Sequence, residues 1–127
     1  MKNYALSARS ESDDVEDAIN NFAKESYERL REKGFYHGNL DISEIAAHIA
    51  NCHSELTEAW EEIRAGKDPK HVEIKNGKLE GFPIELADLV IRVLTLSVHL
   101  DIDIIKAIKD KNTFNKKRPY KHGGKVV

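Results

Sequence analysis

The chain has 127 residues, of which 40% are hydrophobic and 33% are charged, values typical of one soluble globular domain with its own core. Charged side chains interrupt the longest apolar stretch, residues 84–100, so we expect no membrane span. The first residues lack a signal-peptide pattern, which favours the cytoplasm. The single cysteine, Cys52, excludes an internal disulfide and a thiolate metal site, and we expect it to pack in a helix.

The charge is distributed unevenly along the chain. Residues 106–127 contain eight Lys/Arg and one acid, whereas the residues before them contain 12 bases and 21 acids. The net charge is therefore about +7 in the tail and −9 in the body. A basic tail can bind nucleic acid, but a basic tail after an acidic body also suits a metal centre that receives a polyphosphate.

The N-terminal half predicts two helices. Residues 1–11 show no periodicity and are expected to form a loose arm. A first helix begins near Ser12 or Asp13, carries apolar residues at helical spacing and ends at Gly34. A second helix is expected up to Gly66, with Asp41 as its N-cap and Glu44 three residues later as a capping box.

The C-terminal half predicts a turn region and two further helices. Residues 67–82 contain Pro69 and Asn76-Gly77 and are expected to form a loop or flap with a small hairpin. A third helix runs from about Pro83 to Leu100, and a fourth begins after Asp103. The sequence thus predicts an all-α, four-helix bundle-like domain over residues 12–118, with a basic tail over residues 119–127.

The third predicted helix is apolar except for one polar stripe. The stripe recurs at steps of three and four residues and comprises Glu85, Asp88, Arg92, Thr95 and His99. Because the rest of this helix should be surrounded by protein, we expect Glu85 and Asp88 to face the interior or a cleft, where buried carboxylates need partners.

The second predicted helix carries Glu55, Glu58 and Glu62 beside its apolar seam. If the two helices are neighbours, four carboxylates converge, and each pair about 4 Å apart would repel by about 4 kcal/mol at an effective dielectric constant of 20. A hard cation such as Mg²⁺ or Mn²⁺ would offset this repulsion. The alternatives are a solvated acidic face on the second helix and an ion pair between Asp88 and Arg92.

Two acidic pairs in order carry a family resemblance. Glu55-x-x-Glu58, separated by 26 residues from Glu85-x-x-Asp88, within residues 54–66 and 80–93, resembles the MazG-like all-α nucleotide pyrophosphohydrolases. The ending, with Lys111, Asn115 and Arg118, is similar to the tail that contacts phosphate in that family. The resemblance covers roughly residues 40–125.

The resemblance implies Mg²⁺-dependent cleavage of a nucleoside triphosphate between its α and β phosphates, by a homodimer or homotetramer. It assigns the two acidic pairs to metal, with Glu55 or Glu58 free to act as general base. Many family members carry an acid where this chain has Ser54. Glu62 is therefore either a replacement ligand or a surface residue.

The sequence also allows other interpretations of these residues and of the function. Lys111, Asn115 and Arg118 could form an ordinary basic helix end. Trp60 is expected in the core rather than stacked on a base, and the six histidines are expected to be structural or exposed. Within the enzyme class, a dUTP-type diphosphatase or a phosphoribosyl-ATP pyrophosphohydrolase is the alternative. Outside it, the alternatives are nucleic-acid binding through the tail and a metal-free helical interaction module.

Overall fold

A computed structural model describes residues 9–120 of the chain. Its elements, in order, are α1 (Glu11–Glu32), α2 (Ile42–Arg64), β1 (Glu73–Lys75), β2 (Lys78–Glu80), α3 (Phe82–His99) and α4 (Ile104–Lys116). The prediction of an all-α chain with one small hairpin is confirmed. Within the described residues, no helix combines the length and the apolar character needed to cross a membrane.

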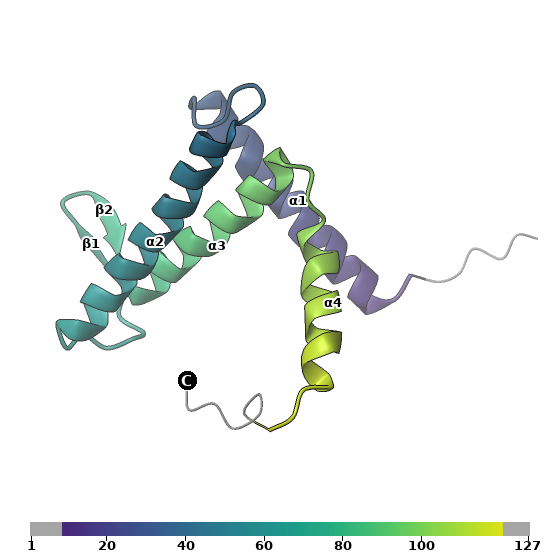
Figure 1. Cartoon of the computed structure of the whole chain (residues 1–127). Coiled ribbons are helices and arrows are strands. Elements are labelled where there is room, and N and C mark those ends of the chain that lie inside the picture. The colour runs from purple at the N-terminus through teal and green to yellow at the C-terminus, as the bar shows by residue number, and fades with distance from the viewer. Residues whose placement is uncertain (1–8, 121–127) are drawn as a thin grey trace, which may run out of the picture.

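Helix α3 is the centre of the structure. It lies beside α2, with the hairpin at their shared end, and α1 packs on α3 as well (Figure 1). Because a hairpin of two three-residue strands joins α2 to α3, the two helices run antiparallel. This arrangement places the N-terminal half of α3 against the C-terminal half of α2, where the acidic pairs of both helices lie.

Helix α4 does not close a four-helix bundle within one chain. The backbone turns at Asp101, which has a φ of 54°, and the side chain of Asp103 then caps α4 in a new direction. Figure 1 shows α4 leaving the far end of α3. An ion pair of 2.7 Å between Lys109 and Glu16 ties α4 to α1. Of the four helices expected to form a bundle, α1 and α2 pack against α3, and α4 does not join them as a fourth member.

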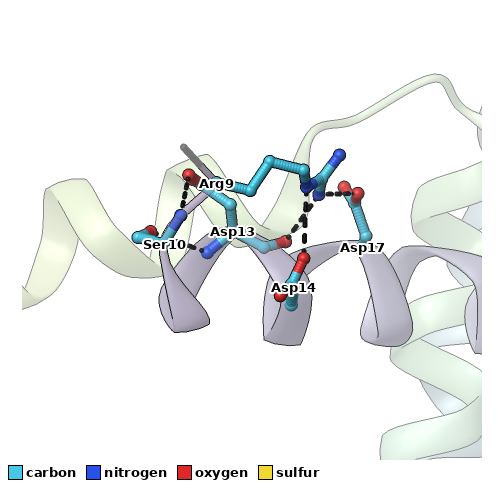
Figure 2. Close-up of polar contacts among 5 residues, drawn as sticks. All are labelled: Arg9, Ser10, Asp13, Asp14 and Asp17. Atoms are coloured by element: carbon cyan, nitrogen blue, oxygen red, sulfur yellow. Dashed lines mark hydrogen bonds and ion pairs between the residues drawn. The ribbon is translucent and has the colours of Figure 1, made fainter. Parts of the chain in front are cut away.

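The first helix begins with a capping box that was not predicted, because the helix was expected to start near Ser12 or Asp13. The Ser10 side chain accepts a hydrogen bond from the backbone N–H of Asp13, whose carboxylate accepts one from Ser10 N–H (Figure 2). Arg9 also pairs with Asp14 and Asp17. The helix thus starts at Glu11, inside the expected arm, and residues 1–8 of that arm lie outside the described residues, as do residues 121–127 of the expected tail.

The predicted capping box of α2 is confirmed. The carboxylate of Asp41 accepts a 2.8 Å hydrogen bond from the backbone N–H of Glu44, and the carboxylate of Glu44 accepts one of 2.9 Å from Asp41 N–H. Two of the backbone donors that a helix leaves unpaired at its start are thereby satisfied.

The predicted hairpin is also confirmed, and it is fixed to its neighbours. Ile74 pairs with Leu79 around the Asn76-Gly77 turn, whose residues have φ values of 52° and 76°. Lys67, just after α2, lies 2.8 Å from the carboxylate of Glu62 and 3.5 Å from that of Glu73. This lysine therefore links the end of α2 to β1.

Much apolar surface remains uncovered in the single chain. Val15 is 57% exposed, Phe22 47% and Val90 54%, although the periodicity of α1 and α3 predicted buried faces. They belong to an open groove of about 570 Å³, here called the apolar groove. It is lined by Val15, Ala18, Ile19, Phe22, Val90, Leu94, Ile105 and Ile108. An exposed apolar patch of this kind is typical of an interaction surface.

Candidate metal centre

Three of the four predicted carboxylates meet between α2 and α3. Glu55 and Glu58 from α2 and Glu85 from α3 each offer an oxygen, and these three oxygens all lie within 4.8 Å of one another. Glu55 is buried, with 7% of its surface exposed, whereas Glu85 is half-buried and Glu58 is exposed. Because Glu55 is buried, it does not belong to a solvated acidic face, and this alternative is wrong for Glu55.

The fourth carboxylate, Asp88, lies one helical turn after Glu85 and is not part of that three-residue group. It lines a cavity together with Glu55. Partial burial raises the pKa of Asp88 above its ordinary value, and the neighbouring charges of Glu55 and Glu58 add to the rise. Asp88 thus borders the cluster, and the negative charge of the cluster disfavours its ionisation.

Glu85 shows the electrostatic cost of this convergence most clearly. Burial, followed by hydrogen bonding to Glu58 and Glu55, raises the pKa of Glu85 from 4.5 to about 8. Without a cation, Glu85 therefore keeps a proton that it shares with its neighbours at neutral pH. Three converging carboxylate oxygens fit a hard divalent ion, which would displace that proton.

Arg92 is the cation that contacts the cluster. Its Nε donates a 2.7 Å hydrogen bond to Oε1 of Glu55, and no corresponding bond to Asp88 exists in the described part of the chain. The expected alternative of an Asp88–Arg92 ion pair is thus wrong, because the side chain of Arg92 crosses to α2. Even with Glu85 protonated, one guanidinium leaves a net negative charge on Glu55, Glu58 and Asp88 together.

Glu62 does not join the cluster. Its carboxylate is 2.8 Å from Lys67, and this ion pair directs it toward the hairpin. The sequence alternative in which Glu62 replaces a missing ligand is therefore not supported. Ser54, where many members of the resembling family carry an acid, is exposed and hydrogen-bonds to the backbone carbonyl of Ala50.

A cavity of about 170 Å³ adjoins the carboxylates, and we call it the aromatic cavity. It is lined by Leu30, Phe35, Tyr36, His48, Glu55, Asp88, Ile91, Arg92 and Thr95. Residues from α1, α2, α3 and the loop after α1 thus surround one space. Because Glu55 and Asp88 form part of its wall, a ligand in this cavity would contact carboxylate oxygens at the edge of the cluster.

Two of the lining residues, Tyr36 and His48, belong to a stack of aromatic rings. The ring of Tyr36 lies parallel to that of His48, with centroids 4.6 Å apart, and 4.9 Å from that of His99. Tyr27 hydrogen-bonds to Nδ1 of His99 at 2.7 Å. Burial, with the charge of Arg92, lowers the pKa of His48, so its imidazole is neutral at pH 7.

Sequence reasoning missed most of this cavity. Tyr36 is buried but lies in the loop after α1, where no periodicity marks it. The predicted polar stripe was the available signal, because Asp88, Arg92 and Thr95 of that stripe line the cavity. Trp60 was expected in the core, yet it is 56% exposed, with the guanidinium of Arg64 5.1 Å above its ring.

The expected phosphate-binding residues are not near the cluster in one chain. Lys111, Asn115 and Arg118 are exposed on or just after α4, and none lines the aromatic cavity. Lys111 instead lies over the ring of Phe114, at 5.1 Å. The direction of α4, which leads away from the acidic half of α3, accounts for the separation (Figure 1).

Comparison with known proteins does not extend this picture: no protein-family model, curated protein or solved structure matches the chain. The site must therefore be interpreted from its own chemistry. It offers hard oxygen ligands, a neighbouring cation and an adjoining cavity with aromatic walls. Such a combination can hold a divalent ion beside a planar ligand that carries anionic groups.

Proposed function

We propose that this chain is a Mg²⁺-dependent nucleoside triphosphate pyrophosphohydrolase that converts an NTP or dNTP and water to the monophosphate and pyrophosphate. The observation that carries the proposal is the convergence of Glu55, Glu58 and Glu85 beside the aromatic cavity. The order and spacing of the acidic pairs, which resemble those of the MazG-like pyrophosphohydrolases, support it. Mn²⁺ is an alternative ion of similar ligand preference.

The chain's residues would divide the work as follows. Glu55, Glu58, Glu85 and Asp88 would hold the divalent ion, which when bound supplies Lewis-acid stabilisation of phosphate charge. Glu58 is the exposed member of the triplet, whereas Glu55 is held by Arg92. We therefore assign Glu58 as the carboxylate that accepts a proton from the attacking water.

The aromatic cavity would take the base. Its aromatic wall, which includes Tyr36 and His48, suits a planar heterocycle, and the neutral His48 imidazole offers one donor and one acceptor at its edge. Glu55 and Asp88, at the wall of the same cavity, would then lie on the side of the phosphates. A base in this cavity would hold the α-phosphate near the ligands, as an in-line displacement requires.

We further propose that the active form is a homodimer or a higher homo-oligomer. The apolar groove, about 570 Å³ in volume, is the surface that a second copy would cover. Lys111, Asn115 and Arg118 remain candidates for phosphate contacts, because in an assembly the tail of one copy can approach the carboxylates of another. In that case they would act between chains.

The decisive experiment measures pyrophosphate release from a panel of nucleoside triphosphates, with Mg²⁺ or with a chelator. The variants are Glu58→Gln and Asp88→Asn, and the matched control is Glu61→Gln, which alters an exposed acid on the same helix. We expect metal-dependent release that both site variants lose and the control retains, with the helical circular dichroism unchanged.

Two results would redirect the interpretation. If no nucleotide releases pyrophosphate and Mg²⁺ leaves the melting temperature unchanged, a metal-free helical interaction module becomes the better hypothesis. If the protein instead binds nucleic acid with a steep salt dependence that Asp88→Asn does not alter, the basic tail carries the function.

A further inference from the structure

Arg92 stands at the boundary between the carboxylate triplet and the aromatic cavity. It lies on α3 one turn after Asp88 and one turn before Thr95, and all three residues line the aromatic cavity. Its Nε is 2.7 Å from Oε1 of Glu55 on α2. This contact joins the two helices that supply the proposed metal ligands.

The contact involves the most buried member of the triplet. The Glu55 side chain is 10% exposed and that of Arg92 is 34% exposed. Solvent therefore screens the guanidinium charge more than it screens the carboxylate. One oxygen of Glu55 is fixed by Arg92, while the same carboxylate also offers an atom within 4.8 Å of those of Glu58 and Glu85.

We propose that Arg92 is a positioning residue that orients Glu55 for the divalent cation and so raises the affinity of the free protein for it. Hydrogen bonds that orient a ligating carboxylate commonly change metal affinity by about 10–100-fold. The inference rests on the proposed function, because it takes the triplet as the metal site. It adds a contributor that neither the acidic spacing nor the tail pattern includes.

The opposite role is physically possible, and it predicts the opposite sign. A guanidinium near the triplet repels a second cation, so an arginine that merely occupied the metal position would compete with the ion. Removal of a competitor tightens metal binding, whereas removal of a positioning residue weakens it. The sign of the change in metal affinity therefore separates the two roles.

The experiment measures Mn²⁺ affinity, by calorimetry or by electron paramagnetic resonance, in the nucleotide-free protein. The variant is Arg92→Met, which keeps the aliphatic stem and removes both charge and donors. The control is Arg64→Met on α2, an exposed arginine whose ion pair is with Glu61. We expect Mn²⁺ to bind about 10–100-fold more weakly to Arg92→Met, with no comparable loss in the control.

Two further variants show whether Arg92 acts through Glu55. Arg92→Lys keeps a charged donor and should restore part of the affinity. In a Glu55→Gln background, Arg92→Met should cause much less further loss than in the unaltered chain, because the group it orients has changed. If Arg92→Met does not fold, Arg92→Gln is measured in its place with the same expected weakening.

Three results would contradict the positioning role of Arg92, and only one of them would also contradict the metal site. Equal or tighter Mn²⁺ binding by Arg92→Met would overturn the positioning role and leave the hydrolase proposal standing. An equal loss in the Glu55→Gln background would also overturn it, because Arg92 would then act independently of Glu55. If the unaltered protein binds no Mn²⁺, the metal site itself fails, and with it both proposals.

Discussion

The hydroxyl of Tyr36 donates a hydrogen bond to Thr95 across 3.1 Å, and both residues are buried. The direction follows because Thr95 has one hydroxyl hydrogen, and its oxygen already lies 2.8 Å from the carbonyl of Ile91. Thr95 has no exposed surface and Tyr36 only 3%. A loop residue is thereby held against the middle of α3.

Two replacements of Tyr36 should separate the contribution of this hydrogen bond to stability from the contribution of the ring. Tyr36→Phe removes one hydrogen bond and should lower the free energy of unfolding by about 1 kcal/mol. Tyr36→Ala also removes the stacked ring, and a loss of about 3–5 kcal/mol is expected. Urea unfolding monitored by circular dichroism measures both, and equal losses in the two variants would contradict the assignment.

The stability of the metal-free protein should fall as the pH rises through the range in which Glu85 titrates. The folded-state pKa of Glu85 is about 8, above its ordinary value of 4.5, so between these values the folded state holds more protons than the unfolded state. Stability contributed by protonated Glu85 is therefore complete below pH 4.5 and is lost as the pH rises through 8. The raised pKa of Asp88 acts in the same direction.

Thermal melts between pH 5 and 9 test this dependence. We expect a lower melting temperature at pH 9 than at pH 6 in chelator, and a smaller difference in Glu85→Gln, which cannot ionise. Because Mg²⁺ requires the deprotonated ligands, its affinity should increase over the same range. A pH profile that Glu85→Gln leaves unaltered would assign the effect to other groups.

His48 should affect nucleotide binding without affecting polyphosphate binding. It lines the aromatic cavity, whereas His53, on the same helix, is exposed and does not. We expect His48→Ala to raise the KM for the preferred nucleotide by about tenfold, within the range of base–aromatic stacking. The inhibition constant of tripolyphosphate should stay the same, and His53→Ala should leave both constants unaltered.

The apolar groove should control the oligomeric state. Val90 lies in the groove and is 54% exposed, while Val72, before the hairpin, is 43% exposed and lies outside it. A charge at position 90 would be buried without a partner if a second copy covers the groove. Val90→Glu should therefore shift the protein to monomer in sedimentation experiments, and Val72→Glu should not. Equal sedimentation of both variants with the unaltered chain would contradict this interface.

Local features of the fold could be predicted from the sequence because they depend on neighbouring residues. The Asp41–Glu44 capping box and the Asn76-Gly77 turn both form through contacts within a few residues. The meeting of Glu55 and Glu85 needed one further step, which was that two helices joined by a short hairpin lie antiparallel.

Features that depend on the direction of a chain segment could not be predicted in this way. The course of α4 is set by a single left-handed residue, Asp101, and aspartate shows no pattern that demands this conformation. Tyr36 enters the aromatic cavity from a loop, where apolar periodicity gives no information. The sequence offered an ion pair of Arg92 with Asp88 on the same helix only as an alternative, and the observed pair with Glu55 depends on the separation of two helices.

Gly81 connects the hairpin to α3, and its φ of 136° is one that other residues rarely adopt. A methyl group there would lie 2.2 Å from the carbonyl oxygen of His71, so a side chain would force the hairpin and the helix start apart. The carbonyl of Gly81 also accepts the backbone hydrogen bond of Glu85, at 3.1 Å. Gly81 thus allows the close approach between the segment before the hairpin and the first turn of α3. A side chain at position 81 should therefore displace Glu85 from the carboxylate triplet, although Gly81 supplies no ligand atom of its own.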